Sequence, residues 1–181
     1  MSLVNGLKKY SLAISIGAII LIILGTLVEG GSLFQKLLFV IGAPFLGFTA
    51  YLNKQKMFTS LQIVVTIGAI LAFCSFLLPL SRYIILVGAG IISIGYLVKT
   101  KFSREDSFWT IGGTGLLVLA FGLATDAVCF PILFNSLLVI GGVLIAVYSA
   151  IGFFWLKVKI SLIFLILNVI FIINPLRIIF F

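Results

Sequence analysis

Residues 38–47 read LFVIGAPFLG, and residues 137–146 read LLVIGGVLIA, 99 positions further along the chain. The same shift also aligns polar residues in the apolar stretch that precedes each copy. The aligned pairs of small or polar residues are Ser11 with Thr110, Ser15 with Thr114 and Gly42 with Gly141. Such matches arise by chance less readily in an apolar sequence than matches between aliphatic residues. The pattern therefore predicts an internal duplication.

The composition excludes a water-soluble domain. Of the 181 residues, 63% are hydrophobic and 9% are charged, whereas about a quarter of a soluble domain is charged. Continuous apolar runs without the alternation of a barrel strand indicate helices, and each run is close to the ~20 residues that cross a bilayer. We expect an all-α polytopic membrane protein, a single transmembrane domain over residues 1–181 with seven transmembrane helices. The apolar runs cover residues 10–28, 33–52, 58–80, 82–98, 107–125, 131–153 and 160–180.

The basic residues predict an orientation in the membrane. Nine of the 12 Lys and Arg residues flank alternate helix ends, which by the positive-inside rule places the N-terminus inside and the C-terminus outside. The nine are Lys8, Lys9, Lys54, Lys56, Lys99, Lys101, Arg104, Lys157 and Lys159, and the three on the opposite side are Lys36, Arg82 and Arg177. Topology thus accounts for the net charge of +8, and no nucleic-acid partner is expected. We expect an integral protein of the cytoplasmic (inner) membrane, in contact with the lipid bilayer.

The predicted helices divide into three, a linker helix, and three more. The first repeat covers about residues 8–81, the linker helix about 82–99 and the second repeat about 107–181. The third apolar stretch of each repeat ends in a similar motif, PLSR at 79–82 and PLR at 175–177. Because a single linker helix returns the chain to its starting side, the two repeats are expected to insert in the same orientation. Parallel repeats are related by an axis along the membrane normal, and a binding site is expected at the interface between them.

This organisation resembles the SWEET sugar facilitators and the PnuC-type vitamin transporters. The resemblance covers the topology of the whole chain and few of its motifs, since the Pro-Gln pair of many relatives is absent. Asn168, midway along the last apolar stretch, corresponds to an Asn that SWEET-like proteins place in the third helix of a repeat, facing the pathway. The resemblance implies a membrane transporter with its pathway between the repeats.

The chain contains few residues of the types that carry out catalysis. There is no His, and the four acidic residues lie at helix ends or in connectors. Cys74 and Cys129 do not have Cys-x-x-Cys spacing, and the run Gly112-Gly113-Thr114-Gly115 lacks the Lys that follows in a phosphate-binding loop. We therefore expect no catalytic residues, no metal site, no cofactor and no enzymatic activity.

Uncharged polar residues inside the apolar stretches are the candidates for a substrate pathway. Several are spaced three or four residues apart, or seven, and so share one face of a helix. Hydroxyl and amide groups suit a neutral polar solute, but such residues also bond the carbonyls of their own helix or bridge neighbouring helices, and both interpretations stay open. The candidates are Ser11, Ser15, Gln62, Thr66, Thr110, Thr114, Ser161 and Asn168.

Charged residues repeat at the outer ends of the predicted helices. Glu29 and Asp126 occupy corresponding positions in GTLVEGG at 25–31 and GLATDAV at 122–128, and Arg82 and Arg177 lie on the same side. They are candidates for a charged outer mouth that attracts a solute or is closed by ion pairs. The alternative is that they are solvated charges at helix ends.

Two functions are consistent with these features. The first is a small transporter or facilitator for a neutral or weakly charged small solute, with its pathway between the two repeats. The alternative is a non-catalytic structural or accessory subunit of a larger membrane complex, which the short connectors favour. The expected partners beyond lipid are accordingly a small polar solute, or other membrane subunits or further copies of the chain.

Overall fold

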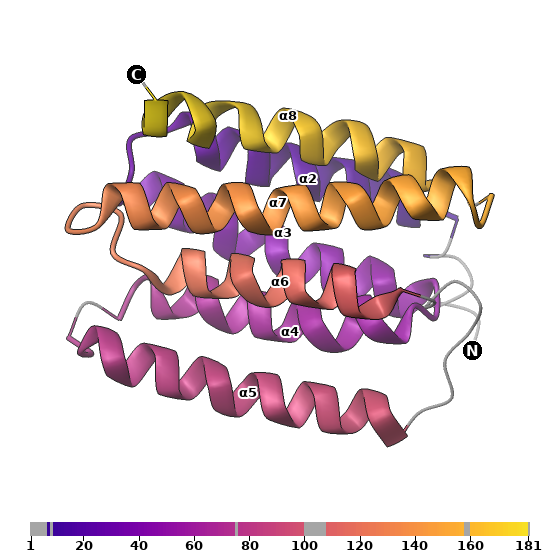
Figure 1. Cartoon of the computed structure of the whole chain (residues 1–181), viewed down its shortest axis with the longest axis horizontal. Coiled ribbons are helices and arrows are strands. Elements are labelled where there is room, and N and C mark those ends of the chain that lie inside the picture. Colours follow the sequence, from indigo (N-terminus) through magenta and orange to yellow (C-terminus); the bar gives the residue numbers. More distant parts are fainter. Residues whose placement is uncertain (1–6, 8, 75, 100–107, 158–159, 181) are drawn as a thin grey trace.

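The computed structural model describes residues 7, 9–74, 76–99, 108–157 and 160–180, and over this part the chain is all-α. Seven helices occur at the positions of the seven predicted apolar stretches (Figure 1). They are α2 (Ser11–Leu27), α3 (Leu33–Leu52), α4 (Lys56–Leu71), α5 (Pro79–Lys99), α6 (Trp109–Ala124), α7 (Pro131–Phe154) and α8 (Ile160–Phe180). The predicted all-α fold class is confirmed.

One predicted boundary is wrong. The third apolar stretch was expected to be helical to Leu80, but α4 ends at Leu71, and a short turn-containing connector leads to α5 at Pro79. This connector contains Phe73, Phe76 and Leu78 and is as apolar as the helices, so hydropathy does not mark it. The physical signal is Pro79, which has no backbone N–H and is favoured in the first turn of a helix.

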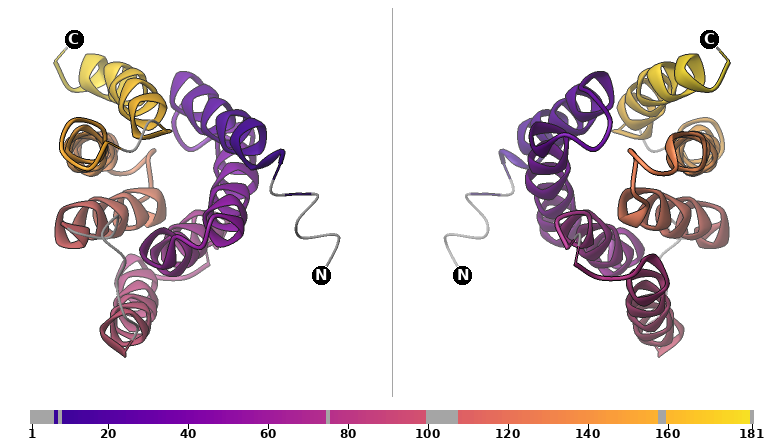
Figure 2. Two further views of the ribbon diagram at one scale, coloured as in Figure 1. Left: turned by 90° about the vertical axis from the view of Figure 1, so that its right-hand side faces the viewer. Right: turned by 90° about the vertical axis from the view of Figure 1, so that its left-hand side faces the viewer.

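Six helices enclose a common interior. Going round the bundle, the neighbours in contact are α2, α3, α4, α6, α7 and α8, and α8 contacts α2 to complete the ring (Figure 2). The remaining helix, α5, lies outside this ring and packs against α4 and α6. We call the six-helix arrangement the helix ring.

Small residues let the backbones of the ring approach closely. A Cβ atom added at Gly68 in α4 would lie 2.5 Å from the carbonyl oxygen of Ala120 in α6. A Cβ at Gly42 in α3 would lie 3.0 Å from the carbonyl oxygen of Ala18 in α2. Within the second half of the chain, a Cβ at Gly141 in α7 would lie 2.9 Å from a carbonyl oxygen of α6, that of Gly115. Larger residues at these contacts would therefore push the helices apart.

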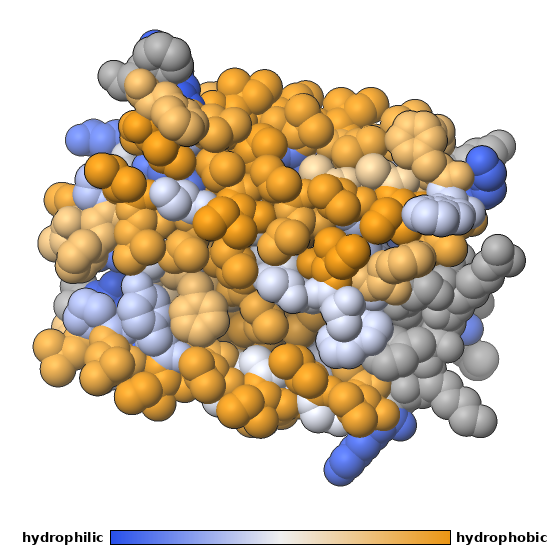
Figure 3. Space-filling view, in the orientation of Figure 1, coloured by the Kyte–Doolittle hydropathy of each residue, from blue (hydrophilic) through white to orange (hydrophobic). Residues whose placement is uncertain are grey.

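The length and surface of the helices are compatible with a membrane. Among the described residues, α3, α5 and α7 are long and apolar enough to span a bilayer, whereas α2, α4 and α6 are apolar but shorter. Large apolar side chains are exposed along most of the helices. The face in Figure 3 is apolar across its middle, and hydrophilic residues gather towards its two ends. This is the surface expected of a protein embedded in lipid.

The charged residues divide the molecule into two ends, because successive helices run in opposite directions (Figure 1). The end at which α2, α4, α6 and α8 begin is called the lysine end here and carries Lys9, Lys54, Lys56, Lys99 and Lys157. The opposite end is called the acidic end and carries Glu29, Lys36, Arg82, Asp126 and Arg177. Four further cations assigned to the inner side, Lys8, Lys101, Arg104 and Lys159, lie outside the described residues.

Candidate functional site

The interior of the helix ring contains a cavity of about 130 Å³. A water molecule needs roughly 10–15 Å³ of such space, so the cavity has room for a small molecule. All six ring helices contribute to its walls. The connector residues Asn53, Gln55 and Leu156 also line it, so it extends to the lysine end.

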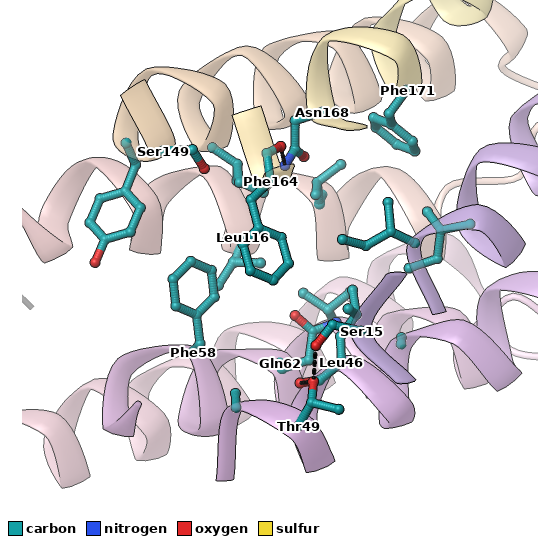
Figure 4. A pocket seen from close by; sticks show the side chains of 18 of the residues that line it. Ser15, Leu46, Thr49, Phe58, Gln62, Leu116, Ser149, Phe164, Asn168 and Phe171 are labelled. Carbon is teal, nitrogen blue, oxygen red and sulfur yellow. Dashed lines mark hydrogen bonds between the residues drawn. The ribbon is translucent and has the colours of Figure 1, made fainter. Parts of the chain in front are cut away.

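Four of the eight predicted pathway residues meet in this cavity. Ser15 of α2, Gln62 of α4, and Ser161 and Asn168 of α8 all line it. Because α4 and α8 are separated by two helices in either direction round the ring, Gln62 and Asn168 belong to opposite walls (Figure 4).

The other four residues do not line the cavity. Ser11 is buried, and the Thr66 hydroxyl donates a 2.8 Å hydrogen bond to the carbonyl oxygen of Gln62 in its own helix. Thr110 and Thr114 are exposed on the outside of α6 and do not have the inward placement predicted for them.

The glycines of α6 explain the outward position of its threonines. Gly112 and Gly113 face Tyr148 of α7 and Leu61 of α4, where an added Cβ would come within 2.9 and 3.0 Å of the nearest side-chain atom. The sides of α6 that pack against α4 and α7 are thus occupied by glycine. The hydroxyl groups of Thr110 and Thr114 lie on the other side of the helix, away from these contacts. Spacing alone identified a shared stripe but not the direction in which it faces.

Gln62 is the most distinctive polar residue of the cavity. The residue is 4% exposed, and no hydrogen bond of its side-chain amide is found in the described part of the chain. Its amide atoms are nevertheless not fully enclosed by protein. Within the described residues, the fully buried side-chain N or O atom that lacks a hydrogen-bond partner is Nε of Arg82, and the amide atoms of Gln62 do not belong to this class. The Gln62 amide therefore faces the cavity with its donor and acceptor groups uncommitted.

The remaining polar groups near it are partly committed to the protein. The Ser15 hydroxyl donates to Oγ1 of Thr49 at 2.8 Å, and the Thr49 hydroxyl donates to the carbonyl oxygen of Leu46 at 3.0 Å (Figure 4). Nδ2 of Asn168 donates to the carbonyl oxygen of Phe164 at 2.7 Å. Oδ1 of Asn168 has no hydrogen bond within the described residues and can accept one from a ligand.

Sequence reasoning missed several polar residues of the cavity. They are Thr49, Asn53, Gln55 and Ser149. Thr49 and Asn53 are four residues apart and thus share a stripe, a signal of the kind that identified Ser11 and Ser15. They lie near the end of a helix, where polar residues are common and attract no notice.

The cavity changes from polar to apolar along its length. In each helix that contributes a polar lining residue, that residue lies nearer the lysine end than the apolar lining residue of the same helix that is closest to the acidic end. Towards the acidic end the lining is Ile19, Ile22, Phe39, Ala43, Leu119, Leu123, Leu138 and Phe171. Phe39, Leu123 and Leu138 are buried and also line separate hollows at the acidic end. We call these three residues the apolar layer, because they lie between the cavity and those hollows.

Only some of the residues predicted to form the outer mouth lie close together. Arg82 and Asp126 line one small hollow with Lys36, whereas Glu29 and Arg177 are exposed and do not line it. Within the described residues no ion pair joins these four predicted residues. Instead Nη1 of Arg82, a residue that is 5% exposed, donates at 3.4 Å to the carbonyl oxygen of Ala124. The guanidinium thus binds the C-terminal end of α6, where the helix dipole favours a cation.

Asp126 is held by its own connector. The backbone N–H groups of Cys129 and Val128 donate to its Oδ1 at 3.2 and 2.9 Å. The hydrogen bond from Cys129 is the main cause that lowers the pKa of Asp126, and the positive charges of Arg82 and Lys36 add to it, while partial burial opposes the shift.

Buried and half-buried polar side chains tie helices together at the acidic end. Nε2 of Gln35 donates to the carbonyl oxygen of Gly25 at 3.0 Å, and its Oε1 accepts from the backbone N–H of Gly31 at 2.8 Å. Nδ2 of Asn174 donates to the carbonyl oxygen of Thr26, which links α8 to α2. The hydroxyl groups of Tyr83 and Thr125 lie 2.9 Å apart and link α5 to the end of α6.

Neither a metal-binding cluster nor a known relative adds to this description. No group of three or more His, Cys, Asp or Glu residues that could hold a metal ion occurs within the described ranges. Comparisons with known protein families, with curated proteins and with solved structures found no match for the chain. The candidate site is therefore defined by its geometry, a cavity whose described lining residues are uncharged and in which the buried Gln62 has an uncommitted amide.

Proposed function

We propose that the protein is a small transporter or facilitator that carries an uncharged solute through the helix ring. All seven helices span the membrane in this proposal, with the lysine end in the cytoplasm. The solute enters the cavity from the lysine end and leaves when the apolar layer opens. The described residues that line the cavity include no acidic residue, so energy-independent diffusion is the simplest mechanism.

The distribution of charge supports the seven spans. α2, α4 and α6 have 17, 16 and 16 residues, which at 1.5 Å per residue give about 24–26 Å, slightly less than the ~30 Å of hydrocarbon. They lie side by side with longer spans, and a short span is accommodated by local thinning of the bilayer. The lysine and acidic ends lie at opposite ends of the apolar surface, as the positive-inside rule requires.

The contacts of corresponding glycines support two parallel repeats. Gly42 and Gly141 are 99 positions apart, and each lies against a backbone carbonyl of the first helix of its own half. The order of helices round the ring is also compatible with a two-fold relation, in which α2, α3 and α4 correspond to α6, α7 and α8. The cavity then lies on the axis between the repeats.

The observation that carries the proposal is the uncommitted amide of Gln62 in the cavity. Burying an amide without a hydrogen-bond partner is unfavourable by roughly 1–3 kcal/mol judged from mutational data, so a residue of this kind needs water or a ligand as its partner. Packing alone does not explain a glutamine at this position. Hydrogen bonding to a polar group of a solute does explain it.

Osmotic swelling of proteoliposomes tests the proposal. Vesicles containing the protein should swell faster than empty vesicles when a permeant uncharged solute is applied, with ethylene glycol, glycerol and benzyl alcohol as probes. Leu138→Ala, which shortens a side chain of the apolar layer, should increase the rate, whereas Leu116→Trp, which fills the cavity, should abolish it. Equal swelling of protein-containing and empty vesicles for all probes would contradict a transport function.

The second candidate function is an accessory subunit, and the position of α5 favours it. This helix lies outside the ring and exposes Ile84, Ile91 and Ile92. Added Cβ atoms at Gly88 and Gly95 would meet nothing within 4 Å, so the helix offers room for close approach of another helix. Purification in mild detergent separates the two candidates, because obligatory co-purification of other chains supports an accessory subunit.

A further inference from the structure

The chemistry of the cavity indicates which kind of solute it accepts, and this inference rests on the proposed role of the cavity as a binding site. Among the described residues that line it there is no Lys, Arg, Asp or Glu. An ionised ligand would lose its hydration without gaining a counter-charge, which is strongly unfavourable. The ligand is therefore uncharged.

A polyhydroxylated ligand such as a sugar that fills the cavity is also a poor match. Each of its hydroxyl groups needs a partner when it leaves water, and the polar lining residues lie in the half of the cavity nearer the lysine end. The half of the cavity nearer the acidic end is lined by apolar side chains, including Phe39, Leu123 and Leu138. Hydroxyl groups placed there would be left without partners.

Several polar groups of the cavity have no hydrogen bond within the described residues. The Gln62 amide presents a donor and an acceptor from one wall, and Oδ1 of Asn168 presents an acceptor from the opposite wall. The Gln55 amide and the hydroxyl groups of Ser149 and Ser161 are also free, and they line the half of the cavity nearer the lysine end. The Gln62 amide matches a small hydrogen-bonding group, such as a hydroxyl, that can both donate and accept. Aromatic and aliphatic side chains surround these polar groups, including Phe58, Phe164 and Leu116 (Figure 4).

We propose that the cavity binds an uncharged, mainly apolar molecule with a single hydrogen-bonding group. The polar group bonds the Gln62 amide, and the apolar body extends towards the apolar layer. Apolar burial supplies most of the affinity, and the Gln62 amide fixes the orientation of the ligand.

Ligand-observed ¹⁹F NMR on the protein in lipid nanodiscs tests this inference. The probe is 4-fluorobenzyl alcohol, and its charged analogues are 4-fluorobenzoate and 4-fluorobenzylammonium. A fluorinated monosaccharide represents the polyols. The alcohol should bind saturably and be displaced by unlabelled benzyl alcohol, whereas the charged analogues and the sugar should show no displaceable binding. Empty nanodiscs correct for partition into lipid.

Variants locate the binding site. Gln62→Leu should weaken binding of the alcohol about tenfold, because one neutral hydrogen-bonding partner is lost. Thr114→Val is the control and should leave the affinity unchanged, because Thr114 is exposed on the outside of α6 and does not line the cavity. Leu116→Trp should abolish displaceable binding, and a monodisperse elution profile must accompany that result.

The outcomes separate this inference from the transport proposal. Displaceable binding that Gln62→Leu weakens, without any swelling activity, supports the ligand class and contradicts transport. Swelling activity with glycerol, without displaceable binding of the alcohol, overturns the ligand class and leaves transport standing. Binding of the charged analogues or the sugar as tightly as the alcohol also overturns it, as does binding that Gln62→Leu leaves unchanged.

Discussion

Gln35 and Gln62 are both buried glutamines, but they have different roles at the two ends of the helix ring. Both are 4% exposed. At the acidic end, both polar atoms of the Gln35 amide are bonded to backbone groups of the α2 terminus and the following connector. Towards the lysine end, the Gln62 amide lines a cavity and has no hydrogen bond within the described chain.

The difference extends to other amide side chains. Gln35 and Asn174 each donate across helices at the acidic end. In the cavity, Asn53 and Asn168 donate to carbonyl oxygens of their own helices. Amide side chains thus join helices at the acidic end and line a space at the other, where hydroxyl groups join the helices instead, as between Ser15 and Thr49. This comparison teaches that burial of a polar residue in an apolar chain does not reveal its role until its partners are known.

The largest expected effect concerns backbone packing near the acidic end. Gly68→Ala places a methyl group 2.5 Å from the present position of the Ala120 carbonyl oxygen, and the backbone there cannot rotate away. We expect a loss of roughly 1–3 kcal/mol in stability, as for other overpacked sites, seen as a lower thermal midpoint in detergent. Gly47→Ala is the matched control nearer the lysine end, because its added Cβ meets only the Gln62 side chain, at 3.3 Å. Equal losses in the two variants would contradict the difference between the ends.

The paired glutamines give the next largest effect. Gln35→Leu leaves the carbonyl of Gly25 and the N–H of Gly31 without their present partners, and should lower stability by about 1–2 kcal/mol. Gln62→Leu removes an amide that has no protein partner, so its thermal midpoint should stay near or above that of the unaltered protein. The measurement is thermal unfolding of both variants in the same detergent without added ligand. A larger loss for Gln62→Leu would show that this amide fastens helices after all.

The smallest expected effect is the pH dependence of the acidic end. Because the folded-state pKa of Asp126 lies below its ordinary value of 3.8, the carboxylate stabilises the fold above that value. This contribution is lost as the pH falls through the folded-state pKa. The thermal midpoint of Asp126→Asn should therefore be slightly below that of the unaltered protein at pH 7, and the difference should shrink as the pH falls below 3.8. Glu29→Gln controls for the loss of one negative charge at this end, and a difference that does not change with pH would contradict the assignment.

The sequence by itself determined the class and the elements of this protein. Continuous apolar runs can form only structures that satisfy their own backbone hydrogen bonds in lipid, so the all-α class and the approximate positions of the seven helices followed from composition. The end of α4 at Leu71 did not follow, because the connector before Pro79 is as apolar as the helix. Membrane insertion of every helix and the two repeats remain predictions.

Only the tertiary structure decided which polar residues share a space. Spacing along a helix places Thr110 and Thr114 on one stripe but does not say whether that stripe faces the interior. The closely packed glycines Gly112 and Gly113 settled the direction, because they occupy the sides of α6 that face its neighbours. The joining of Ser15, Gln62 and Asn168 in one cavity likewise depends on the order of helices round the ring. That order is fixed by contacts between residues far apart in the chain. Local sequence patterns carry no information about such contacts.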